Sequence, residues 1–132
     1  MKLTRILLSG GLWLAQLALA SAYAALGWLK ATQPLDQLTP MMKWIPDFPV
    51  WFVRGLGVVE ILGAIGLILP SLTRIQPRLT ILAALCIMLH QCCAVALHVS
   101  RGEISGLGLN AALFGLAALI FWGRRKIVIP PR

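Results

Sequence analysis

Residues 51–70 read WFVRGLGVVEILGAIGLILP, and this stretch carries most of the information about the fold. It is long and apolar enough to cross a bilayer as a helix, yet it carries Glu60 near its middle. A charge at that depth costs about 2.5–3.5 kcal/mol on insertion scales, so Glu60 requires a partner, a water-filled cavity or a proton. Gly57, Gly63 and Ala64 lie three or four positions from Glu60, on the same helical face. Small residues there let another helix approach Glu60 closely.

The partner of Glu60 is expected on another helix. Arg54 lies six residues before Glu60, about 120° round an α-helix, so the two side chains diverge. The whole composition points to the same membrane setting. Of the 132 residues, 59% are hydrophobic and 12% are charged, where a soluble domain carries about 25% charged residues.

The basic excess, 12 Lys and Arg against 4 Asp and Glu, does not indicate nucleic-acid binding. The basic residues lie at the ends of apolar runs, as membrane anchors do. All three cysteines fall inside one apolar run, which excludes an extracellular disulfide framework.

Four apolar runs predict an all-α fold: a transmembrane four-helix bundle with up-down-up-down topology, formed by one domain over residues 1–132. The predicted spans are residues 6–29, 51–70, 79–99 and 106–123. The first run also contains sites that resemble those of signal peptidase, and a cleaved signal peptide is the alternative. The run continues to Trp28, well past those sites, which favours a retained span.

The distribution of basic residues predicts that both termini are cytoplasmic, because four spans put both termini on one side of the membrane. That side holds eight of the basic residues: Lys2, Arg5, Arg74, Arg78, Arg124, Arg125, Lys126 and Arg132. The other side holds four: Lys30, Lys43, Arg54 and Arg101. The connector 31–50, rich in proline and tryptophan, lies on that other side. It is interpreted either as a lid over the mouth of the bundle or as a peripheral surface element.

Counting about 1.5 Å per residue places the polar side chains in a column on one half of the bundle. Near the midplane we expect Gln16, Glu60, His90 and Gln91. In the outer half we expect Tyr23, Arg54, His98 and Asn110, and at the outer interface Lys30, Arg101 and Glu103. The inner half is expected to be almost wholly apolar. This pattern predicts a pocket open to the non-cytoplasmic side rather than a pore.

Glu60 with His90 or Gln91 is the expected midplane pair. Apolar surroundings and a nearby histidine tune the protonation of a carboxyl in opposite directions, so such a site can accept or release a proton. The alternative is a buried hydrogen bond that fixes helix register.

Arg54, His98 and Asn110 are candidates to bind an anion or a quinone carbonyl. The alternatives are snorkelling of Arg54 to lipid head groups and an interhelical hydrogen bond for Asn110. Cys86, His90 and Cys93 share a helical face. Because a structural metal site needs a fourth ligand, buried cysteines acting as small hydrophobes are the favoured interpretation, and no metal is predicted.

Several motifs resemble those of the DoxX-like proteins, which are small four-helix bacterial membrane proteins. The motifs are Gly27–Lys30, Met42–Pro46, Arg54–Pro70, His98–Glu103, Asn110 and Trp122–Arg124. The resemblance covers nearly the whole chain, and Arg54–Pro70 is its most specific part. The family's recurring polar positions correspond to Lys30, Arg54, Glu60, His98, Arg101, Glu103 and Asn110. His90, Gln91 and the cysteines are not part of the pattern, so His90 and Gln91 are secondary candidates, and Tyr23 is a ligand-binding candidate from its depth alone.

The resemblance implies a multi-pass protein of the bacterial cytoplasmic membrane, and it fixes location better than reaction. Because the family takes its name from a subunit of a thiosulfate:quinone oxidoreductase, the favoured function is a redox-linked or quinone-facing subunit with oxidoreductase partners. Glu60 would handle the proton, and Arg54 with His98 would orient an anionic or carbonyl group. A small proton-coupled transporter or exporter is one alternative, although small multidrug exporters carry their glutamate in the first span. A structural subunit without its own chemistry is the other.

Overall fold

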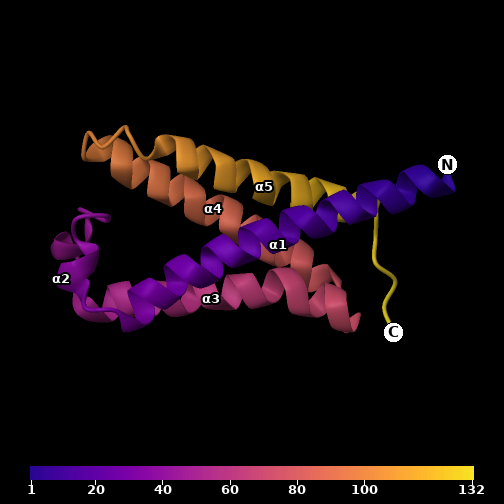
Figure 1. The fold of residues 1–132 in the computed structure, drawn as a ribbon, viewed down its shortest axis with the longest axis horizontal. Helices are drawn as coiled ribbons and strands as arrows, with labels where there is room; N and C mark the ends of the chain where they lie inside the picture. The colour runs from indigo at the N-terminus through magenta and orange to yellow at the C-terminus, as the bar shows by residue number, and fades with distance from the viewer.

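The computed structural model describes residues 1–132 and contains only helices. The four long ones are α1 (Lys2–Thr32), α3 (Val50–Thr73), α4 (Arg78–Ser100) and α5 (Leu107–Lys126). Two short ones, α2 (Leu35–Leu38) and the 3-10 helix η1 (Ile45–Asp47), lie in the connector between α1 and α3 (Figure 1). All four long helices have the length and apolar composition needed to cross a membrane. The prediction of an all-α four-helix bundle is confirmed.

The long helices alternate in direction and close into a ring. α1 packs most extensively on α3, and α4 on α5, while α3 meets α4 and α1 meets α5 over smaller areas. Both termini lie at one end of the bundle, here called the termini end (Figure 1). The connector 33–49 and the turn 101–106 lie at the other, here called the connector end. The two ends provide different surroundings for polar side chains.

Contact between glycines joins α1 to α3 near the connector end. A Cβ atom built on Gly57 would lie 2.6 Å from the carbonyl oxygen of Gly27, and one built on Gly27 would lie 2.6 Å from the carbonyl oxygen of Gly57. Only residues without a side chain permit two backbones to approach so closely. The predicted face of small residues around Glu60 therefore forms the contact between these helices, and Ala64 on the same face is buried as well.

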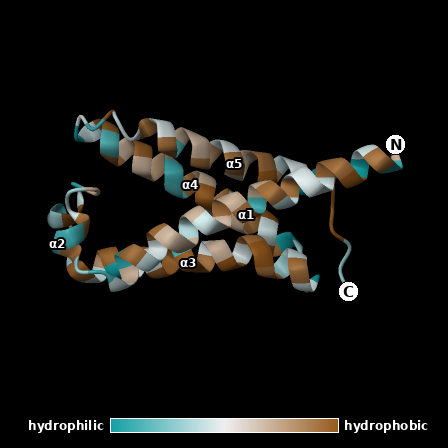
Figure 2. Cartoon of the chain, viewed as in Figure 1, coloured by the Kyte–Doolittle hydropathy of each residue, from teal (hydrophilic) through white to brown (hydrophobic).

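The core lies along the bundle axis, and the outer surface is apolar. Leu19, Leu67, Ala84, Ala117 and Ile120 have no exposed surface. Large apolar side chains are also exposed on every long helix, and hydrophobic residues recur along the whole length of these helices (Figure 2). An exterior this hydrophobic requires lipid around it, because water would not solvate it.

The helices extend beyond the predicted spans. α3 does not stop at Pro70 but continues to Thr73, and ends where Arg74 adopts a left-handed conformation with φ of 62°. A proline so close to the end removes only one intrahelical hydrogen bond, which the last turn tolerates. α5 continues past residue 123 to Lys126, which makes Arg124 part of the packed bundle rather than of the tail.

Candidate functional site

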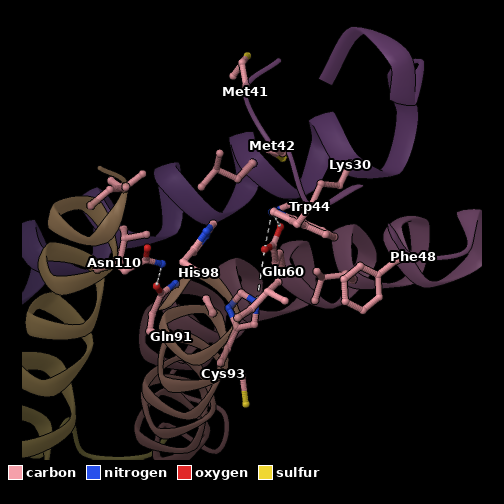
Figure 3. Close-up of a pocket in the computed structure, with 18 of the residues that line it drawn as sticks. Lys30, Met41, Met42, Trp44, Phe48, Glu60, Gln91, Cys93, His98 and Asn110 are labelled. Atoms are coloured by element: carbon pink, nitrogen blue, oxygen red, sulfur yellow. Dashed lines mark hydrogen bonds and ion pairs between the residues drawn. The ribbon is translucent and has the colours of Figure 1, made fainter. Parts of the chain in front are cut away.

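A cavity of about 460 Å³ opens at the connector end of the bundle. The connector and α3 supply its aromatic and methionine walls, which are Met41, Met42, Trp44, Phe48 and Phe52 (Figure 3). Polar side chains from all four long helices face the same space: Lys30, Glu60, His90, Gln91, His98 and Asn110. The sequence left open whether the connector is a lid over the mouth of the bundle or a peripheral surface element. In the structure it forms one wall of the cavity.

Lys30 and Glu60 form a buried ion pair in the cavity wall. Lys30 Nζ donates to both carboxylate oxygens of Glu60, at 2.7 and 2.9 Å, and both side chains are less than a tenth exposed. Lys30 lies in the last turn of α1, and its stem passes over Gly57, one helical turn before Glu60. The long lysine side chain therefore carries its charge into the bundle, as far as the Glu60 carboxylate. Counting depth along the backbone places Lys30 at the outer interface, because the count follows the backbone and ignores the length of the side chain.

The observed partner of Glu60 differs from the expected one. The nearest atom of His90, Nε2, lies 3.7 Å from Glu60 Oε1, and Gln91 forms no hydrogen bond with Glu60. Lys30 is thus the pairing partner of Glu60, the role expected of His90 or Gln91. The prediction that the partner lies on another helix holds, and the reason is the Gly27–Gly57 contact that brings α1 against α3.

A hydrogen-bonded chain runs across the bundle from His90, whose ring lies beside Glu60. Tyr23 Oη lies 2.8 Å from His90 Nδ1 and accepts a hydrogen bond from Gln91 Nε2 at 2.5 Å. Asn110 Nδ2 donates to Gln91 Oε1 at 2.8 Å. Residues from α1, α3, α4 and α5 thus contribute to one polar network. The two secondary candidates, His90 and Gln91, lie at its centre.

A second network closes the rim of the cavity at the end of α4 and in the turn that follows it. His98 Nδ1 lies 2.9 Å from Glu103 Oε2, and Arg101 Nε donates to Glu103 Oε1 at 2.8 Å. Hydrogen bonds from Arg101 and His98 lower the pKa of Glu103. Arg101 also pairs with Asp47 and donates to the carbonyl of Lys43 at 3.0 Å. The turn 101–106 is thereby fastened to the connector that forms the cavity wall.

Arg54 does not line the cavity. Its Nη1 donates to the carbonyls of Lys30 and Gln33, at 2.9 and 2.6 Å. These carbonyls belong to the end of α1, where backbone oxygens lack helical partners, so Arg54 caps the helix. Its influence on the site is indirect, because it fixes the turn of α1 that carries Lys30.

A polar cluster at the termini end was not predicted. Arg124 is 2% exposed, and its Nε donates to Gln16 Oε1 at 2.6 Å. Gln16 Nε2 in turn donates to the carbonyl of Leu67 at 2.6 Å, and Ser71 lies 2.7 Å from Thr80 between hydroxyl oxygens. The expectation of an almost wholly apolar inner half is therefore wrong, and Gln16 belongs to this cluster. Arg124 follows an apolar run like any membrane anchor, so its sequence position gave no sign of its burial.

The cysteines do not assemble with other ligands. Cys86, Cys92 and Cys93 are exposed as free thiols, which differs from the buried setting expected of them. No group of three or more His, Cys, Asp or Glu side chains has the geometry to hold a metal ion.

Comparison with models of known protein families shows to which family the chain belongs. A family model described as the DoxX-like family matches residues 14–120. The chain belongs to the DoxX-like family. The matched range contains the whole lining of the cavity and ends before Arg124. No curated protein and no solved structure matches the chain. Membership and the four apolar helices make this DoxX-like chain a multi-pass integral membrane protein in contact with lipid.

Proposed function

We propose that the cavity binds the head group of a membrane quinone, and that the chain acts as a quinone-facing subunit of a redox complex. The observation that carries the proposal is the division of the cavity wall into an aromatic and methionine part and a polar part. A volume of about 460 Å³ lies within the range typical of small-molecule sites, which combine apolar walls with a few placed polar groups. A flat ring with two polar oxygens matches both parts.

The aromatic wall suits a planar ligand. The rings of Phe48 and Phe52 are stacked with centroids 4.9 Å apart, and Trp44 meets Phe48 edge-on at 5.6 Å. Offset stacking and edge contacts with such rings favour an aromatic or quinonoid guest over a branched aliphatic one. Met41 and Met42 adapt their shape to substituents, because the thioether side chain is flexible and polarisable.

The polar wall suits proton exchange with the ligand. A quinone, when bound, accepts two electrons and two protons as it is reduced. The electrons would come from an oxidoreductase partner. Lys30 uses two of its three N–H donors on Glu60, which leaves one to hold a carbonyl oxygen. Tyr23 and His90 lie within hydrogen-bond distance, at 2.8 Å, and a short movement of His90 toward Glu60, now 3.7 Å away, would complete a path for a proton along the wall. In this proposal Glu60 handles the proton, while Asn110 and His98 help to orient the ring.

A fluorescence titration tests the proposal. A short-chain ubiquinone is added to the purified protein in detergent, and quenching of Trp44 is followed, with Trp44→Phe identifying its share of the signal. We expect saturable quenching. Binding should be roughly tenfold weaker for Asn110→Leu, because this variant cannot donate a neutral hydrogen bond to a buried oxygen of the quinone. Cys86→Ser, on the same helix as His90 but outside the cavity, is the control and retains wild-type affinity. Quenching that does not saturate, or is equal in all variants, counts against quinone binding.

Infrared difference spectroscopy tests the role of Glu60. We expect a carboxyl band that shifts when the short-chain quinone binds and that is absent from Glu60→Gln. A band that ignores the quinone would remove Glu60 from the proposed chemistry.

A structural role is the second candidate, and the complete pairing of Glu60 with Lys30 favours it. A fully paired carboxylate can simply hold α1 against α3. In that case Glu60→Gln lowers stability, and the quinone titration shows no specific binding.

We also propose that the chain resides in the bacterial cytoplasmic membrane with both termini in the cytoplasm. The excess of Lys and Arg at the termini end, eight residues against four, supports this orientation. Fusions of a reporter to the C-terminus test it: a reporter active only in the cytoplasm should be active, and one active only outside should be silent.

A further inference from the structure

We propose that Arg124 and Arg78 form a second binding site, at the termini end, for a phosphate group. Arg124 is buried to 2% exposure, and two of its nitrogens donate to Gln16 and Ser9, at 2.6 and 3.1 Å. Its guanidinium carbon also lies 5.3 Å from the ring centre of Trp13. The third nitrogen, Nη2, is buried and has no hydrogen-bonding partner in the protein. A buried donor on a charged group requires a partner.

This guanidinium forms no salt bridge with any carboxylate of the protein. Its only carboxylate side chains are Asp36, Asp47, Glu60 and Glu103, and each lies in or next to the connector-end elements. Glu60 already pairs with Lys30, and Glu103 with Arg101 and His98. Because buried charges in proteins are paired or fully hydrogen-bonded, the counterion of Arg124 is expected to come from outside the chain.

A small hollow gives an anion access to the buried arginine. Arg124, Arg78, Ser71 and Ile81 line it together with the tail residues Val128 and Ile129. Its volume of about 10 Å³ holds one water-sized group, such as a single phosphate oxygen. Arg78 is exposed and is the first residue of α4, which begins without a side-chain cap. The N-terminal dipole of that helix favours negative charge.

The C-terminal tail forms a fixed wall of the hollow. Arg74 Nε donates to the carbonyl of Pro130 at 2.9 Å, and the backbone N–H of Arg132 donates to the carbonyl of Arg74 at 3.0 Å. The tail therefore runs back toward the α3–α4 turn (Figure 1). Arg78 and Arg124 both line the hollow, so a phosphate oxygen that enters it lies against both arginines.

The phosphate can come from a lipid head group or from solution. The site lies where α3 ends and α4 begins, at the level at which lipid phosphates meet the ends of membrane helices. Arginine binds phosphate oxygens through charge-assisted, often bidentate hydrogen bonds, and both sources offer the same oxygens. The experiment separates them.

The test uses the full-length protein, freed of lipid in a sugar detergent that contains no phosphate. Thermal unfolding and native mass spectrometry are followed while phosphatidylglycerol, phosphatidylcholine with the same acyl chains, or inorganic phosphate is added. We expect saturable stabilisation and retained lipid with phosphatidylglycerol. In Arg78→Gln and Arg124→Gln the affinity should fall roughly tenfold, since each loses charged donors. Arg125→Gln, which alters the adjacent exposed arginine outside the hollow, is the matched control and binds like wild type.

The outcomes divide clearly. Stabilisation by phosphatidylglycerol but not by inorganic phosphate assigns the site to lipid, and an equal response to inorganic phosphate assigns it to the free ion. If Arg124→Gln fails to fold, Arg78→Gln still tests the site, because Arg78 is exposed and forms no hydrogen bond in the core. No response to either phosphate source, or equal loss of binding in Arg125→Gln, overturns the proposal.

Discussion

The two ends of the bundle bury charge in opposite ways. At the connector end, Lys30 and Glu60 neutralise each other beside a cavity of about 460 Å³. At the termini end, Arg124 is buried and no carboxylate pairs with it, and the volume of the adjoining hollow is about 10 Å³. Within one membrane bundle, the buried charge at the connector end is neutralised by a carboxylate of the protein, whereas the buried charge at the termini end forms no salt bridge with the protein. The first arrangement leaves room for a ligand with its own chemistry, and the second suits an anchor.

Breaking the ion pair should have the largest effect on stability. Glu60→Leu leaves Lys30 buried without a partner, and we expect a loss of about 3–5 kcal/mol in the free energy of unfolding. Lys30→Met combined with Glu60→Leu removes both charges and should restore most of that loss. Unfolding by a denaturing detergent in mixed micelles measures both. A double variant no more stable than Glu60→Leu would contradict the assignment of Lys30 as the partner.

Glycine substitutions at the two ends should differ in severity. In Gly57→Ala the new Cβ meets the backbone of Gly27 and of Ala31, which cannot move aside, so we expect a loss of up to about 3 kcal/mol. In Gly123→Ala the nearest atoms to the new Cβ all belong to the side chain of Leu12, which is flexible, and we expect a loss of about 1 kcal/mol or less.

Thermal unfolding of the two glycine variants, side by side in the same detergent, gives the comparison. Equal destabilisation would mean that α1 and α3 can separate slightly at the connector end. That result would weaken the account of why Lys30 reaches Glu60.

Disturbing the termini-end cluster should have a moderate effect. Gln16→Leu removes the acceptor of Arg124 Nε and the hydrogen bond to Leu67, and we expect a loss of about 2 kcal/mol. Added phosphatidylglycerol should recover part of it if a phosphate satisfies the guanidinium. Thermal unfolding with and without that lipid is the measurement, and a variant as stable as wild type would show that the cluster carries little free energy.

The rim should show a small dependence on pH. Because hydrogen bonds from Arg101 and His98 lower the pKa of Glu103 below its ordinary value of 4.5, the ionised form is stabilised by folding. That contribution is fully present above pH 4.5 and disappears as the pH falls through the lowered pKa. The thermal midpoint of wild type should thus drop more between pH 6 and pH 3.5 than that of Glu103→Gln. Parallel curves for the two proteins would show that the rim pair adds no stability.

Much of the cavity wall could be anticipated from the chain itself. Glu60 in an apolar run requires a partner wherever it packs, and Asn110 and His98 lie at similar depth on neighbouring spans. The identity of the partner could not be anticipated, because counting along a helix axis ignores the reach of a lysine side chain. The direction of Arg54 was likewise open, since it depends on where the end of α1 lies.

The fold class, the four spans and the small-residue face follow from the amino-acid sequence, because hydrophobic length and helical period are local properties of the chain. The resemblance to the family, which the family model confirms, is also visible in the sequence. Which charges are neutralised depends on tertiary contacts. Lys30 meets Glu60 because two glycines let α1 and α3 touch, and Arg124 turns inward because Gln16, Ser9 and Trp13 receive it. Such contacts join residues far apart in sequence, and no local pattern encodes them.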